Sequence, residues 1–400
     1  MAANEPASKN GTESAGWPLL IGLGLAQIVS WGTIYYGFAL LLPPLQRALG
    51  AGQGVVVGAY SVALLAAGIG APWVGRAIDR GGGRAVMTAG SLLAALAFAA
   101  LSRVESVAAL YLVWLGLGVA MAATLYEPAF AVVTQAFGPR YRRAITVLTL
   151  FGGFASTVFW PATAALIERF GWRDAVLFLA AFNLCINVPL HALLLPGGRA
   201  RTAAPRGPAT TAMPIGTTSF IALATALLAQ AIAISALAVH FLPLLVARDM
   251  TPVAAAAVGA LIGPMQVLGR IVEMTASPRA SAVAVGRVVV LMLPAALLTL
   301  YGAGTDPRLL AIYAILYGAG NGAMTIVRGA VPVELWGREH YGALMGWLAT
   351  PAMLARASGP LLASLAWSWA GGYDAVLLLL AAIAAAAAVA FHVAVGRRRP

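Results

Sequence analysis

The chain has 400 residues, of which 61% are apolar and only 10% are charged, with a formal net charge of +12. An ordinary soluble domain is about 25% charged, so this composition excludes a water-soluble globule. The basic residues lie in short segments between apolar runs and form no single patch, which argues against a nucleic-acid partner. The single cysteine, Cys185, excludes a disulfide framework and a cysteine-based metal site. No cofactor or metal motif is recognisable.

Apolar runs of about twenty residues, the length that crosses a bilayer core, recur along the whole chain. Because lipid offers no hydrogen-bond partner to an open backbone, such runs must be helical. We therefore predict an all-α membrane protein with twelve transmembrane helices. The first six are expected at residues 17–42, 55–74, 85–101, 107–133, 144–167 and 175–195. The second six are expected at 218–246, 253–272, 283–302, 309–333, 342–369 and 375–395.

Three polar segments divide the chain. The N-terminal tail, residues 1–16, lacks the basic start and short apolar core of a cleaved signal. Residues 196–216 are rich in Pro, Gly, Thr and Arg without an apolar period, which predicts a flexible linker between a bundle at 17–195 and a second bundle at 217–395. Residues 396–400 form the C-terminal tail. An even number of helices places both termini on one side of the membrane.

The distribution of basic residues predicts which side that is, because cytoplasmic loops keep Lys and Arg. Termini inside would leave seventeen basic residues in cytoplasmic segments and six in outer loops. The seventeen are Lys9, Arg76, Arg80, Arg84, Arg140, Arg142, Arg143, Arg199, Arg201, Arg206, Arg270, Arg279, Arg287, Arg338, Arg397, Arg398 and Arg399. The six are Arg47, Arg103, Arg169, Arg173, Arg248 and Arg308. We expect a multi-pass inner-membrane (plasma-membrane) protein, embedded in the lipid bilayer, with both termini and the linker in the cytoplasm.

The two halves carry matching residues at nearly constant offsets, as expected of an internal repeat. Each match is weak alone, but all appear in the same order. The matches are Gln27 with Gln230, Pro43 with Pro243, Gly75-Arg76-Asp79 with Gly269-Arg270-Glu273, Thr124 with Thr325, and Asp174 with Asp374.

A glycine-rich segment, GRAIDRGGGR at residues 75–84, is expected to form the loop between the second and third helices. It resembles the signature loop of the major facilitator superfamily, Gly-x-x-x-Asp-Arg-x-Gly-x-basic, at Gly75, Asp79, Arg80, Gly82 and Arg84. The resemblance implies two pseudo-symmetric six-helix bundles, monomeric secondary transport by alternating access, and a loop that latches the halves together on the cytoplasmic side. The alternative is that its arginines merely keep the loop inside by the charge rule.

A narrower resemblance links the chain to bacterial proteins that are similar to monocarboxylate transporters. It rests on the runs SWGTIYYGF, YEPAF, GPMQVLGR and NGAMTIVRGAVPVELWG. It implies a small organic anion as the solute, with coupling to protons. A proton-driven exporter of hydrophobic or drug-like compounds is the alternative, although the fifth helix, TLFGGFASTVFWP, lacks the full glycine and proline pattern of such exporters. A membrane enzyme or sensor would need a catalytic constellation or an attached domain, and the sequence offers neither.

Three charged residues are predicted inside spans, where an ionisable group is costly and marks a functional site. They are Glu127 in the fourth helix, Arg328 in the tenth and Arg356 in the eleventh. Because Thr124 matches Thr325, Glu127 and Arg328 occupy equivalent positions, and the resemblance places both helices beside the solute path. We expect Arg328 to bind an anionic solute and Glu127 to pair with it in the empty cavity and carry a coupled proton. A purely structural Glu–Arg pair, and an Arg356 that snorkels to water, are the alternatives.

Two polar stripes accompany these charges. Arg328 shares a helical face with Tyr317, Asn321 and Thr325, at spacings of four, four and three residues. In the first helix Gln27, Trp31 and Tyr35 recur every four residues, and Gln230 is the counterpart of Gln27 in the seventh helix. We expect both stripes to line the solute cavity, with helix packing as the alternative.

Overall fold

The computed structural model describes residues 16–137, 141–197, 217–276, 280–336 and 341–396, and every regular element in those ranges is helical. The first half comprises α2 (Gly16–Ser30), η1 (Trp31–Tyr36), α3 (Phe38–Leu49), α4 (Gln53–Gly81), α5 (Gly83–Leu101), α6 (Val107–Thr124), α7 (Tyr126–Phe137), α8 (Tyr141–Gly153), α9 (Ala155–Phe182), η3 (Asn183–Asn187) and α10 (Val188–Leu194), where η1 and η3 are π-helices. The second comprises α11 (Thr218–Val246), α12 (Pro252–Ala260), α13 (Ile262–Ala276), α14 (Ala282–Ala303), α15 (Pro307–Trp336), α16 (Tyr341–Ala370) and α17 (Tyr373–Gly396). The predicted tails and most of the predicted linker lie outside the described residues.

Within the described chain, ten stretches are long and apolar enough to cross a membrane. One of them, Arg143–Leu194, has 52 residues and holds two spans. The helix direction changes within it at Gly171, whose φ of 78° and ψ of 163° are conformations that glycine adopts readily. The 30-residue helix α16 adds a further long element. Together these make the twelve membrane helices that the sequence predicts.

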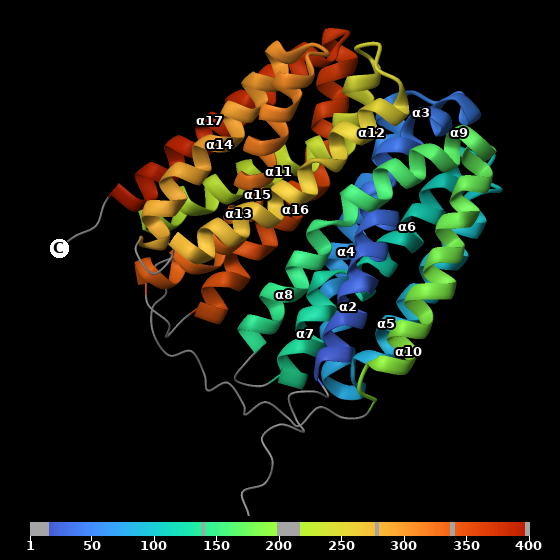
Figure 1. Ribbon diagram of the computed structural model, residues 1–400, viewed down its shortest axis with the longest axis horizontal. Helices are drawn as coiled ribbons and strands as arrows, with labels where there is room; N and C mark the ends of the chain where they lie inside the picture. The colour runs from blue at the N-terminus through green and yellow to red at the C-terminus, as the bar shows by residue number, and fades with distance from the viewer. Residues whose placement is uncertain (1–15, 138–140, 198–216, 277–279, 337–340, 397–400) are drawn as a thin grey trace, which may run out of the picture.

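The two halves lie side by side and are not parallel over their whole length (Figure 1). They approach each other at the end where α3, α9 and α12 lie, and they diverge toward the end that carries the tips of α7, α8 and α10. The halves are joined mainly by α4 with α16, α9 with α12 and α3 with α11, and less extensively by α13 with α8 and α9.

The approaching end is sealed by both polar and aromatic contacts. Gln53 at the start of α4 lies 3.2 Å from the Nδ1 atom of His240 in α11, and both side chains are buried. The rings of Trp160 and Phe241 meet across the same interface at 6.1 Å. The structure is therefore closed at this end.

The segment at residues 75–84 is not the loop that we expected. Helix α4 continues through Gly81, and only Gly82, with φ of 82°, separates it from α5. The residues before the glycine run are compatible with a helix, so the chain turns only where successive glycines favour it. Gly75 lies inside α4, where an added Cβ atom would meet nothing within 4 Å, so it makes no close turn.

The other predicted latch residues lie at the junction of α4 and α5. Arg80 is exposed at the end of α4. Arg84 donates from Nε to the carbonyl oxygen of Leu195, at 2.7 Å, and this contact lies within the first half. The side chain of Asp79 lies outside the described residues.

Candidate functional site

A cavity of about 310 Å³ lies between the two halves and is lined by side chains from both. Nine of the ten residues predicted to contact solute line it, namely Trp31, Tyr35, Glu127, Gln230, Tyr317, Asn321, Thr325, Arg328 and Arg356. The tenth, Gln27, is not a lining residue. Tyr36, Tyr126, Phe130, Gln266 and Arg270 also line the cavity, although sequence reasoning did not single them out.

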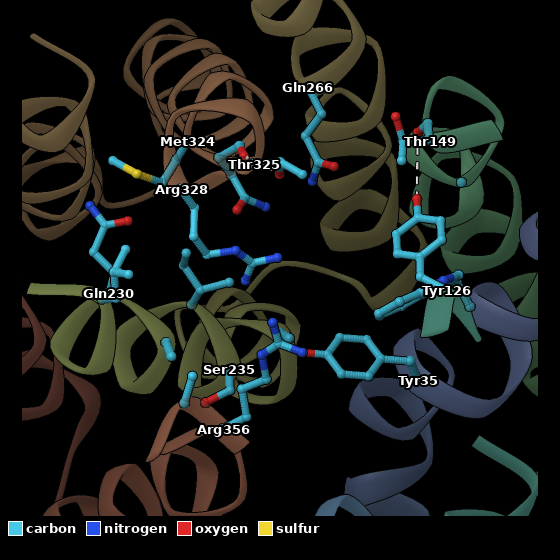
Figure 2. Close-up of a pocket in the computed structure, with 18 of the residues that line it drawn as sticks. Tyr35, Tyr126, Thr149, Gln230, Ser235, Gln266, Met324, Thr325, Arg328 and Arg356 are labelled. Atoms are coloured by element: carbon cyan, nitrogen blue, oxygen red, sulfur yellow. Dashed lines mark hydrogen bonds between the residues drawn. The ribbon is translucent and has the colours of Figure 1, made fainter. Parts of the chain in front are cut away.

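The wall formed by the second half is cationic. In Figure 2, Arg328 of α15 and Arg356 of α16 reach into the same space, and Tyr35 points toward Arg356 from the opposite half. Asn321 and Thr325 line the cavity on the same face of α15 as Arg328, as the predicted stripe requires. Gln230 and Gln266 add two amides from α11 and α13.

Arg270 corrects a prediction, because its position was assigned to a cytoplasmic segment. Helix α13 continues to Ala276, which carries Arg270 into the span Pro252–Thr275 with only 4% of its surface exposed. Its Nη1 atom donates to the carbonyl oxygen of Thr149 in α8, so it links the two halves at the cavity. Glu273, the residue directly after the helix predicted at 253–272, is also buried in α13, at 5% exposed. The spacing of Gln266 and Arg270, four residues apart, was the available signal for one lining face.

The wall formed by the first half is aromatic. The segment Trp31–Tyr36 is a π-helix, in which residue i pairs with residue i+5, so Trp31, Tyr35 and Tyr36 all reach the cavity. The Trp31 ring lies 4.9 Å from the rings of both Tyr35 and Tyr126. Phe130 extends this surface, stacked 5.2 Å from Tyr126. The hydroxyl of Tyr126 donates to the Thr149 carbonyl at 3.4 Å, as Figure 2 shows.

The fourth span is broken beside the cavity, between α6 and α7. Leu125 is extended, with φ of −78° and ψ of −158°. Pro128 in the first turn of α7 has no N–H to donate to the Thr124 carbonyl four residues earlier. The fully buried side chain of Gln27 supplies the missing donor, with its Nε2 atom 2.8 Å from that carbonyl oxygen. The Oε1 atom of Gln27 accepts from the indole of Trp31 at 3.1 Å, so Gln27 positions a lining residue from behind the cavity wall.

Glu127 follows this break, in the first turn of α7, where the helix N-terminus favours a negative charge. Its side chain is exposed and lines the cavity. Arg328 lines the cavity from α15, in the other half. The direct pair of Glu127 with Arg328 stays a prediction.

A bundle of twelve membrane helices in two halves around a polar central cavity is typical of membrane transport proteins. The sequence model of the Major Facilitator Superfamily matches residues 19–302, and the chain belongs to that superfamily. Membership of this superfamily points to transport rather than to catalysis.

Among curated relatives, human monocarboxylate transporter 11 is 35% identical over 127 residues, which cover 31% of this chain and 26% of that protein. Human monocarboxylate transporter 7 is 28% identical over 185 residues, which cover 45% of this chain and 34% of that protein. The matched segments thus span about a quarter to a third of the length of these relatives.

Solved structures share the fold over nearly the whole chain. A bacterial homologue of the human lysosomal transporter Spinster, in an inward-facing and occupied conformation, has a TM-score of 0.71 at 14% identity, covering 97% of both chains. The nucleoside transporter NupG has a TM-score of 0.70 at 16% identity, covering 96% of this chain and all of the other. At these identities the likeness concerns the fold alone.

Proposed function

We propose that this protein moves a small organic anion, a monocarboxylate, across the inner membrane together with a proton. The observation that carries the proposal is the charge of the cavity, which is lined by Arg270, Arg328 and Arg356 against the single carboxylate of Glu127. Charged groups at this depth are costly unless they serve a solute or an ion. The names of the monocarboxylate-transporter relatives support the same solute class.

The arginines can hold a carboxylate in a defined orientation. A guanidinium group donates two parallel hydrogen bonds to a carboxylate, which a point charge cannot reproduce. Arg328 and Arg356 extend into the same space and are the proposed carboxylate ligands (Figure 2). Arg270 is both a lining residue and a hydrogen-bond donor to the opposite half, so an anion that attracts its guanidinium would alter the contact between the halves.

Glu127 is the proposed proton carrier. It faces the arginines across the cavity, so its ionised form lowers the net positive charge that attracts the solute. Protonation of Glu127 removes this competition, which couples proton binding to anion binding. Coupling of this kind needs no direct contact between Glu127 and Arg328.

The conformational cycle follows from where the halves meet. Contacts close the end that holds α3 and α12, while the halves diverge at the end where the predicted cytoplasmic linker begins (Figure 1). With termini and linker in the cytoplasm, this arrangement is inward-facing. In the proposed outward-facing state, the segment from Gly75 to Arg84 latches the halves together. The hydrogen bond from Arg84 to Leu195 lies within one half, as a released latch requires.

The test is uptake into proteoliposomes. Labelled lactate should accumulate when the pH gradient favours proton entry, and a protonophore should abolish that accumulation. Arg328→Lys keeps the charge but loses the bidentate geometry, so we expect its KM for the anion to rise about tenfold. Arg308→Lys, in an outer segment away from the cavity, is the matched control and should behave like the parent.

Two results would overturn the proposal. Gradient-driven efflux of a lipophilic cation such as ethidium, with no carboxylate flux, would favour a drug exporter. Parental KM and coupling in both Arg328→Lys and Glu127→Gln would make the two charges structural.

A further inference from the structure

We propose that the solute is an aromatic monocarboxylate, with its carboxylate toward the wall of α13, α15 and α16 and its ring toward the wall of η1 and α7. This inference rests on the proposed anion transport and specifies which anion the same cavity selects.

The chemistry of the two cavity walls is segregated between the halves. All three lining arginines and all three lining amides, Gln230, Gln266 and Asn321, belong to the second half. Five of the six lining aromatic residues belong to the first half, namely Trp31, Tyr35, Tyr36, Tyr126 and Phe130. A solute that satisfies both walls therefore needs an anionic end and an opposite aromatic or apolar end.

The aromatic wall is continuous. Adjacent ring centroids lie 5.1 Å apart for Tyr35 and Tyr36, 4.9 Å for Trp31 and Tyr126, and 5.2 Å for Tyr126 and Phe130. The first pair is edge-on and the last is stacked, so the surface offers both ring faces and ring edges. An added aromatic ring can then take the offset or edge-to-face geometry that aromatic pairs favour.

The orientation of this wall is held from behind. Gln27 accepts from the Trp31 indole, and the Tyr36 carbonyl accepts from the Trp160 indole at 2.9 Å. The π-helical turn places three aromatic side chains at the cavity within six residues. Rings that are already ordered lose little side-chain freedom when a solute binds, which increases the affinity of each contact.

The size of the cavity limits the solute. Ligand pockets commonly measure about 300–1,000 Å³, and a cavity of about 310 Å³ is at the lower end of that range. This volume fits a single-ring acid better than a drug-sized compound. It also leaves no long extension for a second charged group.

The experiment is inhibition of labelled benzoate counterflow in proteoliposomes by a matched set of unlabelled compounds. Benzoate should compete about three- to tenfold better than cyclohexanecarboxylate, which has a similar size and charge but no π-system. Lactate should compete more weakly than either because it leaves the aromatic wall uncovered. Benzamide, the neutral analogue of benzoate, and phthalate, which adds a second carboxylate, should compete at least tenfold more weakly than benzoate.

A matched pair of variants tests whether the aromatic wall causes the preference for benzoate. Phe130→Leu removes a lining ring and should bring the benzoate-to-cyclohexanecarboxylate preference close to one. Phe178→Leu makes the same change on a ring that is 39% exposed and does not line the cavity, and it should keep the parental preference.

The outcomes separate this inference from the proposed function. Equal competition by benzoate, cyclohexanecarboxylate and lactate would overturn the aromatic solute but leave anion transport intact. A preference for phthalate would also overturn it. Equal competition by benzamide and benzoate would instead remove the role of the arginines and with it the proposed function.

Discussion

The fourth and tenth spans occupy equivalent places in the two halves, yet one is broken and the other is continuous. In both, a threonine hydroxyl donates to the carbonyl four residues earlier, Thr124 to Ala120 at 2.7 Å and Thr325 to Asn321 at 3.0 Å. Four residues after this threonine, the fourth span has Pro128 and the tenth span has Gly329. At this position only the fourth span lacks a backbone donor, and it is interrupted at Leu125, whereas α15 stays continuous through its own Pro332.

The two equivalent glutamines differ for the same reason. The Gln27 amide donates to the Thr124 carbonyl and accepts from the Trp31 indole. Gln230 faces a continuous α15, in which Gly329 keeps the N–H that pairs with the Thr325 carbonyl, and its amide lines the cavity. One member of the repeated pair therefore supports the backbone beside Pro128, and the other lines the cavity.

Proline at position 329 should cause the largest loss of stability. Gly329→Pro removes the donor to Thr325 and places a ring against that carbonyl, so we expect about 3 kcal/mol or more of destabilisation. Thermal unfolding of the purified protein in detergent measures it. Gly329→Ala keeps the N–H and should not fall below the parent in stability. An unchanged transition in Gly329→Pro would show that the second half tolerates the same break.

Removing the Gln27 side chain, which supports the broken fourth span, should have the next largest effect on stability. Gln27→Leu leaves the buried Thr124 carbonyl without its side-chain donor and the half-buried Trp31 indole without its acceptor, so we expect a loss of about 1–3 kcal/mol. Gln230→Leu is the matched control and should change solute KM more than stability. Adding Pro128→Ala to Gln27→Leu restores a backbone donor for Thr124 and should recover part of the lost stability. If the double variant is no more stable than Gln27→Leu, the proline does not create the need for Gln27.

The equivalent charged positions should separate binding from coupling. Glu127→Gln keeps the size and a hydrogen-bonding end but cannot exchange a proton, so we expect exchange with a KM within about twofold of the parent and loss of accumulation driven by a pH gradient. Counterflow and gradient-driven uptake on the same vesicles measure the two properties. Gradient-driven accumulation at the parental level would exclude Glu127 as the proton carrier.

A substitution in the signature segment at residues 75–84 should have the smallest effect on solute binding. Gly75-Arg76-Asp79 lies near the end of α4, whereas its counterpart Gly269-Arg270-Glu273 lies within α13 beside the cavity. We expect Asp79→Asn to slow turnover several-fold at unchanged KM, because a latch acts on the exchange between conformations. Expression and thermal stability should stay parental. A raised KM at unchanged turnover would point to solute contact instead.

Topology provides an independent check on the inward-facing assignment. Single cysteines introduced at Gly197, inside the predicted linker, or at Thr217, directly after it, should not react with an impermeant thiol reagent in intact cells. The same residues should react after the membrane is opened. Reaction in intact cells would reverse the orientation and make the structure outward-facing.

The sequence by itself determined the membrane class, the number of helices, the repeat and most of the cavity lining. Apolar runs of bilayer length leave the backbone no alternative to a helix. Helical periodicity then places Tyr317, Asn321, Thr325 and Arg328 on one face without knowledge of any neighbour. These properties are local, so residue order is sufficient to predict them.

Only the tertiary structure decided what those local features face. Gln27 has the spacing of a lining residue, but its partner at Thr124 lies 97 positions away, and no periodicity reveals that hydrogen bond. Arg270 was assigned to a cytoplasmic segment because the apolar run ends near it, but the helix α13 continues beyond that run. Its contact with Thr149 depends on how α13 packs against α8 of the other half. Glu127 and Arg328 occupy equivalent positions in the repeat and line the cavity from different halves, so the packing of the two halves decides what each side chain contacts. Position along a helix is set by sequence, whereas the partner across a cavity is set by how two separate bundles pack.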